Sequence, residues 1–418
     1  MSPNRLSRVW VGVTGAALVA SLGLTAPGAQ ATIEPHQADP AQVVLDWERT
    51  AFATVYPAKP IPVGVPILGF TSVAMHDAAQ ASLQRGRSSE IAAVATAAHD
   101  VLLSYFPAAA TTLQTKLTSS LATVTDPKAK AKGIRIGTSA AARMLASRAS
   151  DGFEDATIHY SKPSAAGIWQ PVATVPPAPP ADMLAAWLGS LDPLVLDSPV
   201  PVDGPDALNS ADYTADYLEV LNTGRATGSS RTPTQTDTAY FFNANAATMV
   251  GDAMIRMLEA HPVDLRTTAL FFARMHASMT DSVIRCWELK RDVGFWRPFQ
   301  AIPGAGSDGN GATTADTTWT SLLANPNYSD YVSGHACLTS SAVETVRMMF
   351  GEGTDLELRW TGTIQAPSPT TRSYTDLTTI ETDAFHSRIW GGLHFRDAMV
   401  DGYAIGHATA QRVAQLIR

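Results

Sequence analysis

The chain has 418 residues, 45% of them hydrophobic and 16% charged, with a formal net charge of −8. This length and apolar content are enough for a large core in one or two domains and argue against disorder over most of the chain. The negative charge argues against nucleic acid or an anionic membrane surface as a partner.

The first 31 residues predict a cleavable export signal. A basic start with Arg5 and Arg8 precedes an apolar run from Val9 to Leu24, and "APGAQA" offers an A-x-A-like cleavage site after Ala31. A disordered or membrane-anchored N-terminus is the alternative, but the run is short and ends in small residues. Beyond it no apolar stretch is long enough to cross a bilayer. We therefore expect a secreted, soluble mature chain without a membrane span, in which 28 basic and 38 acidic residues give a net charge of −10.

Helical spacing of apolar residues and a high alanine content mark the N-terminal half, and both favour closely packed helices. The predicted helical segments span residues 41–56, 69–83, 89–106, 108–124 and 128–153. Nine prolines from Pro171 to Pro205 then predict an extended crossing or linker, because proline interrupts regular helix. Residues 224–237 predict a loop.

The C-terminal half predicts long helices separated by loops. We expect helix from Thr238 to Lys290, a loop over residues 299–332, helix from Gly334 to Phe350 and a further helix near the C-terminus. No run of alternating strand residues is convincing, so the predicted fold class is all-α. We divide the mature chain into a helical scaffold, residues 32–237, and a region with the candidate chemistry, residues 238–418.

The stretch "CWELKRDVGFWRP" places two cations among aromatic residues. Lys290 offers a point charge and Arg297 a bidentate donor, a pair that suits an oxyanion in a pocket beside Trp287. The alternative is a snorkelling lysine and an arginine paired with an acid such as Asp292.

The stretch "YVSGHA" marks the start of a helix. Free backbone N–H groups and the positive end of the helix dipole make such a start a ready anion site. Ser333 adds a hydroxyl donor, Gly334 lets a ligand approach the backbone, and His335 is a candidate acid–base group. The alternative is that Ser333 is a simple N-cap.

The stretch "HSRIWGGLHFRDAMVDG" places Arg388 and His394 on either side of a Gly-Gly turn that could bring them together. Asp397 and Asp401 follow His394 by three and seven residues, and either carboxylate is a candidate to orient the imidazole. The alternative is a surface arginine and a buried histidine.

Lys-x6-Arg-Pro, Ser-Gly-His and Ser-Arg-x5-His, in this order, resemble the three-part signature of the vanadium-dependent haloperoxidases and type 2 phosphatidic acid phosphatases. Trp287, three residues before Lys290, matches the haloperoxidase form of the first motif. "VLDWERTAFATV", "FTSVAMHDAAQAS" and "ASRASDGF" resemble landmarks of soluble bacterial members, so the resemblance covers nearly the whole mature chain. It implies a predominantly α-helical fold built from helix bundles.

The resemblance also implies roles for the site residues. Lys290, Arg297 and Arg388 would hold the equatorial oxygens of vanadate or phosphate, with the Ser333 hydroxyl and the Gly334 N–H completing the cradle. His394 would bond the vanadium or attack phosphorus, and His335 would be the acid–base group near the opposite apical position. Three fixed cations of this kind stabilise a five-coordinate oxyanion. Two positions depart from the family pattern: Val332 stands where proline is usual, and Ala398 where an aspartate usually follows the histidine.

The first function that this resemblance implies is a secreted haloperoxidase. Vanadate would bind hydrogen peroxide, Lys290 would activate it, and halide attack would give hypohalous acid. Trp287 and the predicted export favour this function. No histidine lies between Pro298 and Ser333, where many bromoperoxidases have one, and Tyr328 would line that side instead, so halide preference stays open.

Other functions compete with the haloperoxidase. An acid phosphatase acting on a soluble phosphomonoester would use His394 as the nucleophile and His335 as the acid. A lipid phosphatase embedded in the membrane is disfavoured because no membrane span is predicted. A non-catalytic phosphate-binding protein is the third hypothesis. A zinc site is a weaker one, because the spacing of the scattered histidines His76, His99, His276 and His386 is not that of metal ligands.

Cys286 and Cys337 are the only cysteines of the chain, and both lie inside the motif stretches. Export permits a disulfide that would brace the site, whereas two buried thiols are the alternative. Because sequence does not give the distance between the two Cα atoms, both hypotheses stay open.

Overall fold

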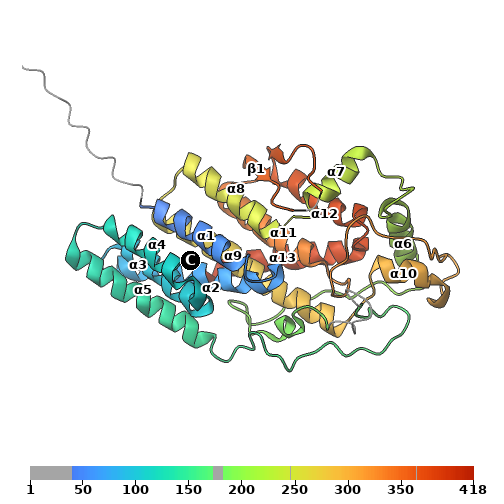
Figure 1. Ribbon diagram of the computed structural model, residues 1–418, viewed down its shortest axis with the longest axis horizontal. Helices are drawn as coiled ribbons and strands as arrows, with labels where there is room; N and C mark the ends of the chain where they lie inside the picture. Colours follow the sequence, from blue (N-terminus) through green and yellow to red (C-terminus); the bar gives the residue numbers. More distant parts are fainter. Residues whose placement is uncertain (1–39, 173–181, 245, 364) are drawn as a thin grey trace, which may run out of the picture. The chain divides into compact units, whose positions relative to one another are not determined.

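The computed structural model describes residues 40–172, 182–244, 246–363 and 365–418, so the predicted export signal lies outside the described residues. The described residues form one compact unit, and the predicted boundary at residue 237 stays a prediction. The regular secondary structure of the described chain is almost all helix, which confirms the all-α prediction (Figure 1). Its helices are α1 (Gln42–Val55), α2 (Ile61–Arg85), α3 (Glu90–Tyr105), α4 (Ala110–Ala122), α5 (Pro127–Ser147), α6 (Ala211–Thr223), α7 (Pro233–Phe241), α8 (Ala246–Ala260), α9 (Leu265–Asp292), α10 (Pro298–Gly304), α11 (Gly334–Phe350), α12 (Leu377–Trp390) and α13 (Arg396–Leu416). Short 3₁₀ turns are η1 (Pro107–Ala109), η2 (Ala186–Ser190) and η3 (Ala305–Ser307).

Helices α2, α3 and α5 pack closely because small residues line their contacts. A Cβ atom at Gly133 would lie 2.4 Å from the Ser89 carbonyl oxygen, and one at Gly137 would lie 2.4 Å from the Ala93 carbonyl oxygen. Only glycine therefore lets α5 approach α3 this closely. Side-chain caps begin both helices, with Ser89 bonding the backbone N–H of Ala92 and Asp126 bonding those of Lys128 and Ala129.

The long helix α9 lies in the middle of the unit and packs against α2, α11 and α13 (Figure 1). It begins at the N-cap Asp264, whose side chain accepts from the backbone N–H groups of Arg266 and Thr267. Most of its side chains are buried, which agrees with contacts on several faces. The last two turns of α9 carry Trp287 and Lys290, so the core helix positions the first motif.

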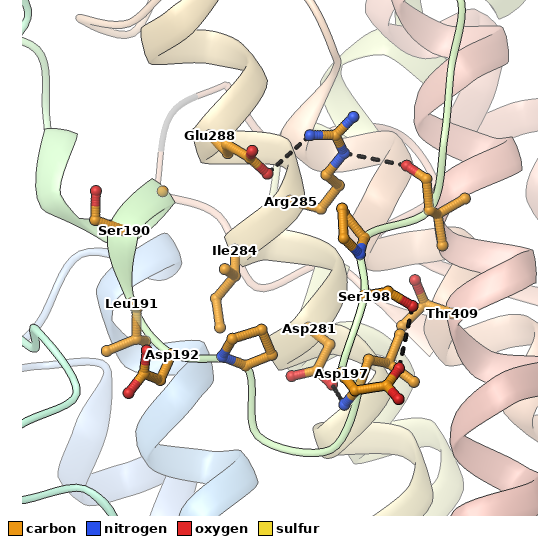
Figure 2. Close-up of a pocket in the computed structure, with 15 residues that line it drawn as sticks. Ser190, Leu191, Asp192, Asp197, Ser198, Asp281, Ile284, Arg285, Glu288 and Thr409 are labelled. Carbon is orange, nitrogen blue, oxygen red and sulfur yellow. Dashed lines mark hydrogen bonds and ion pairs between the residues drawn. The ribbon is translucent and has the colours of Figure 1, made fainter.

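The described part of the proline-rich crossing, residues 182–205, runs along α9 and contains the 3₁₀ turn η2. Asp281 on α9 accepts hydrogen bonds from three successive backbone N–H groups, those of Leu194 (2.6 Å), Val195 (3.0 Å) and Leu196 (2.8 Å). Arg285, one turn on, donates to the Val200 carbonyl oxygen at 3.1 Å (Figure 2). A pocket of about 380 Å³ lies between crossing and helix. The crossing is thus tied to the helix that carries the first motif.

Several predicted boundaries were wrong. The segment predicted as one helix from Thr238 to Lys290 is three helices, α7, α8 and α9. Pro262 and the N-cap Asp264 account for the break before α9. The loop predicted over 224–237 ends early, since Thr232 and Gln235 form a capping box that starts α7. The loop predicted over 299–332 contains α10 and η3, and the last N-terminal helix ends at Ser147 rather than at residue 153. Helix α11 has the predicted bounds.

A β-hairpin that the sequence did not predict follows α11. Strand β1 (Leu356–Arg359) pairs antiparallel with β2 (Thr371–Tyr374), with Leu356 opposite Tyr374. Leu356, Leu358 and Tyr374 are buried in the core. In the part of the chain that the structure describes, no helix has the length and apolar character needed to cross a membrane.

Candidate active site

Lys290 is fully buried in the last turn of α9. Its Nζ donates to the carbonyl oxygens of Ser329 at 2.8 Å and Asp330 at 2.9 Å, which leaves the third ammonium hydrogen for another acceptor. The Nζ atom also lies 4.9 Å from the centroid of the Tyr328 ring and 5.8 Å from that of Trp287. Burial lowers the pKa of Lys290 to about 8.

Arg297 is the fully buried N-cap residue of α10. Its Nε donates to the Tyr328 carbonyl oxygen at 2.6 Å and its Nη1 to the Leu393 carbonyl oxygen at 2.8 Å. The buried Nη2 atom has no hydrogen-bond partner among the described residues. Asp292, the acid suggested as a partner for Arg297, pairs with Arg291. Burial lowers the pKa of Arg297. Because its buried Nη2 donor has no acceptor among the described residues, a bound anion would stabilise it.

Arg388 lies in the last turn of α12 and is also buried. Its Nη1 makes long contacts of 3.4 Å to the Phe242 carbonyl oxygen and to Oδ1 of Asn243. Within the described ranges its buried Nε has no hydrogen-bond partner. Burial, with a smaller contribution from the charge of Arg297, lowers the pKa of Arg388 to about 10. The guanidinium groups of Arg297 and Arg388 therefore each have one buried N–H donor without an acceptor among the described residues.

Ser333, Gly334 and His335 form the start of α11. The buried Ser333 hydroxyl caps the helix by accepting from the Ala336 backbone N–H at 3.3 Å. A Cβ atom at Gly334 would lie 2.8 Å from the Trp287 ring, so the packing of Trp287 requires glycine there. His335, which is partly exposed, donates from Nε2 to the Phe242 carbonyl oxygen at 2.9 Å. Burial and the charge of Arg388 hold the pKa of His335 well below its usual range.

His394 is buried just before the N-terminus of α13. The turn that leads to it includes Gly392, whose φ of +73° is left-handed and whose Cβ would lie 2.4 Å from the Gly224 carbonyl oxygen. Burial, and then the charges of Arg297, Lys290 and Arg388, hold the pKa of His394 well below its usual range. His394 is therefore a neutral imidazole among cations, with a lone pair available for a ligand.

The carboxylate beside His394 is that of Asp330, whose Oδ1 lies 2.7 Å from Nδ1 of the histidine. The two carboxylates proposed from the sequence lie elsewhere. Asp401 accepts a hydrogen bond from the Tyr331 hydroxyl. Asp397 faces Asp206 and Asp401, and burial together with these charges raises the pKa of Asp397 to about 7. Asp330 was missed in the sequence; its signal is an acid three residues before Ser333, in "SDYVSGH".

A cavity of about 280 Å³ opens at this cluster. Trp287, Tyr328, Gly334, His335 and Arg388 line it, so each motif contributes to the wall, whereas Lys290, Arg297, Ser333 and His394 are not among its lining residues. The remaining wall is mostly apolar and consists of Pro60, Ile61, Pro62, Leu184, Asn243, Ala244, Ala324, Pro326 and Leu338. Such a wall, with a few convergent polar groups, is typical of a small-ligand site.

Cys286 and Cys337 are buried free thiols in the structure. They are hydrogen-bonded to each other, and the Cys286 thiol also donates to the Val332 carbonyl oxygen at 3.3 Å. Among the described residues no group of histidine, cysteine or acidic side chains could hold a metal ion. His76 and His99 lie buried on α2 and α3, whereas His276 and His386 lie on α9 and α12.

Comparison with known proteins shows that the fold is similar to that of the vanadium haloperoxidases. Residues 270–418 match the family model of the VCPO second helical-bundle domain. The crystal structure of the first bacterial vanadium-dependent iodoperoxidase is similar with a TM-score of 0.70 at 19% sequence identity, over 92% of this chain and 98% of that one. The holo-type structure of a bacterial vanadium-dependent chloroperoxidase gives 0.68 at 17% identity, over 86% of this chain and 92% of that one. The apo-type structure gives 0.68 at 16% identity, over 85% and 93%. No curated protein sequence matches.

The donor set of this site fits vanadate or phosphate. Both are tetrahedral oxyanions, and the site offers the two uncompensated guanidinium nitrogens of Arg297 and Arg388 and the third hydrogen of Lys290. The neutral His394 adds an imidazole nitrogen, a donor of the kind that bonds a transition metal or attacks phosphorus.

Proposed function

We propose that this chain, whose fold is that of the bacterial vanadium haloperoxidases, is an exported enzyme that holds vanadate and oxidises halide with hydrogen peroxide. One observation carries the proposal: Arg297 and Arg388 each have a buried guanidinium nitrogen without a partner among the described residues. A charged donor buried without an acceptor is costly. In a chain of net negative charge, such donors are best explained by an anion that binds between them.

The residues of the cradle divide the work of holding the anion. Arg297 through Nη2, Arg388 through Nε and Lys290 through Nζ would neutralise the oxygens. The Ser333 hydroxyl and the backbone N–H of Gly334 would donate to the same anion at the start of α11. His394, neutral because it is buried among cations, would supply an imidazole nitrogen to the bound anion. When bound, vanadate supplies Lewis-acid activation of hydrogen peroxide towards attack by halide.

His335 is the residue best placed to move a proton. It lines the cavity, its Nε2–H is held by the Phe242 carbonyl oxygen, and its lowered pKa keeps the ring neutral near pH 7. Its Nδ1 lies 3.4 Å from the Thr339 hydroxyl, which can donate to it. A neutral imidazole at the mouth of the cradle can accept a proton from incoming peroxide. The aromatic rings of Trp287 and Tyr328 line the same space.

The proposal is tested with purified mature protein loaded with orthovanadate and then supplied with hydrogen peroxide and bromide. We expect bromination of a dye that requires vanadate and is lost in His394→Ala. Arg297→Lys should lower vanadate affinity by about tenfold or more, because lysine lacks the planar fork. The matched control is Arg291→Lys, whose side chain is partly exposed and pairs with Asp292, so affinity should stay within about twofold. Failure of the wild type to bind vanadate would exclude this function.

For export, we expect the mature chain in the culture medium to begin at Thr32.

An acid phosphatase acting on a soluble phosphomonoester is the second candidate, and one observation favours it. A nucleophilic histidine needs an orienting group, and the Asp330 carboxylate lies 2.7 Å from Nδ1 of His394 despite the absence of the usual aspartate after it. Phosphate release without vanadate, inhibited by added vanadate, would identify this activity. Bromination without phosphate release would exclude it.

A further inference from the structure

Asp330 connects all three motifs of the site. Its backbone N–H donates to the Phe295 carbonyl oxygen at 2.8 Å, within the first motif, and its own carbonyl oxygen accepts from Lys290 at 2.9 Å. The residue lies three positions before Ser333, in the loop that leads into α11. Its side chain reaches His394 of the third motif. The backbone of Asp330 is therefore fixed on both sides before its carboxylate meets the histidine.

The carboxylate of Asp330 is fully buried, and the backbone N–H of Phe395 also favours its ionised form. Oδ1 lies 2.7 Å from Nδ1 of His394, although the two atoms do not meet the geometry of a hydrogen bond. Three buried atoms here make no hydrogen bond of standard geometry within residues 40–172, 182–244, 246–363 and 365–418. They are Oδ1 and Oδ2 of Asp330 and Nδ1 of His394. Buried polar atoms are rarely left unpaired, so a small rotation that aligns the pair is favoured. Burial raises the pKa of Asp330 to about 7, while the nearby charges of Arg297 and Lys290 favour the ionised carboxylate and oppose that rise.

We infer that Asp330 is the positioning residue of His394, holding the proton of the imidazole on Nδ1 and leaving the Nε2 lone pair free for the bound oxyanion. In a histidine that binds a metal or acts as a nucleophile, the partner of one ring nitrogen fixes which nitrogen carries the proton. The inference rests on the proposed function of the site. It assigns to the loop before the second motif a role that the sequence pattern would give to Asp397 or Asp401.

The first experiment reads the protonation of His394 directly, in the wild-type protein without vanadate. ¹⁵N-labelled histidine distinguishes a protonated Nδ1 from a protonated Nε2 by chemical shift, and His394→Gln assigns the signal. We expect His394 to carry its proton on Nδ1. A proton on Nε2 would overturn the inference whatever the variants do, and this measurement depends on neither vanadate binding nor turnover.

The second experiment measures vanadate affinity in Asp330→Asn, with Asp397→Asn as the competing variant. Loss of a partner behind a ligating histidine costs about 10–100-fold in affinity, so we expect that weakening in Asp330→Asn. The signal of its His394 should shift towards Nε2–H, because the amide can donate where the carboxylate accepts. The inference is overturned if Asp397→Asn weakens binding and Asp330→Asn does not. If the wild type fails to bind vanadate, the proposed function fails, while the protonation state of His394 still decides the inference.

Discussion

Lys290 is the site residue whose charge depends most on pH. Burial lowers its pKa to about 8, so it is protonated at pH 7 and loses its charge as the pH rises through that value. An anion bound by Lys290 must therefore bind less tightly above about pH 8. We expect the vanadate affinity of the wild type to exceed that of Lys290→Gln at pH 7, with a gap that closes between pH 7 and pH 10. Titration of both proteins with vanadate, followed by tryptophan fluorescence, measures the gap.

The comparison with Lys290→Gln is needed because vanadate itself loses protons in the same pH range. That loss affects both proteins, so only the difference between them reports the lysine. A gap that stays constant from pH 7 to pH 10 would show that Lys290 keeps its proton, or that it does not contact the anion.

Individual site residues were predictable from sequence where the chemistry lies within one short motif. Arg388 and Gly334 line the cavity, and Arg297 is a buried cation beside it, because each motif fixes its residues by local spacing. The partner of His394 was not predictable in this way. Asp330 lies 64 positions away in sequence, and only the packing of α9, α11 and α13 brings its loop to the histidine. Asp397 and Asp401 are nearer to His394 along the sequence, but distance along the sequence does not determine which side chains are in contact.

Among the α9 side chains that hold the proline-rich crossing, residues 182–205, Asp281 makes the most hydrogen bonds to its backbone. Asp281 accepts three backbone N–H groups in a row, and burial raises the pKa of its carboxyl to about 6 (Figure 2). Asp281→Ala leaves these N–H groups without an acceptor and should lower the free energy of unfolding by about 2–4 kcal/mol. Chemical denaturation measures the loss, and hydrogen exchange of the peptide around Leu194 to Leu196 should accelerate.

The control for the crossing is Asp197→Ala in the same segment. The side chain of Asp197 is 96% exposed, so its removal should change stability by less than about 0.5 kcal/mol. Equal effects of the two substitutions, or unchanged exchange in Asp281→Ala, would contradict the role of Asp281 as the attachment point.

Helices were predictable as elements, whereas their ends and the hairpin were not. Apolar periodicity indicates helix in α7, α8 and α9, but it continues across the breaks between them, where capping and proline decide. The strands β1 and β2 have four residues each and are separated by 11 residues, so neither shows an alternating run long enough to recognise. Their pairing is fixed by burial of Leu356 and Leu358 against the core, which is a property of the whole fold.

At the scale of the whole molecule, a polar group of three side chains lies in the core between α1, α2 and α9. The Ser72 hydroxyl donates to Glu48 at 2.7 Å and lies 3.1 Å from Nδ1 of His276, and all three residues are buried. Burial raises the pKa of Glu48 to about 8 and lowers that of His276 to about 3. Both groups are therefore uncharged at neutral pH, as expected of ionisable residues in an apolar interior.

The buried Glu48 links the stability of the fold to pH. Between its ordinary pKa of 4.5 and the folded value of about 8, the folded protein holds a proton that the unfolded chain has released. The stability contributed by this proton is complete below about pH 4.5 and is lost as the pH rises through 8, by at most about 1.4 kcal/mol per pH unit. Glu48→Gln cannot titrate, so its free energy of unfolding should fall less than that of the wild type between pH 5 and pH 9. Urea unfolding of both proteins across this range measures the difference, and parallel pH profiles would mean that Glu48 is ionised in the folded core.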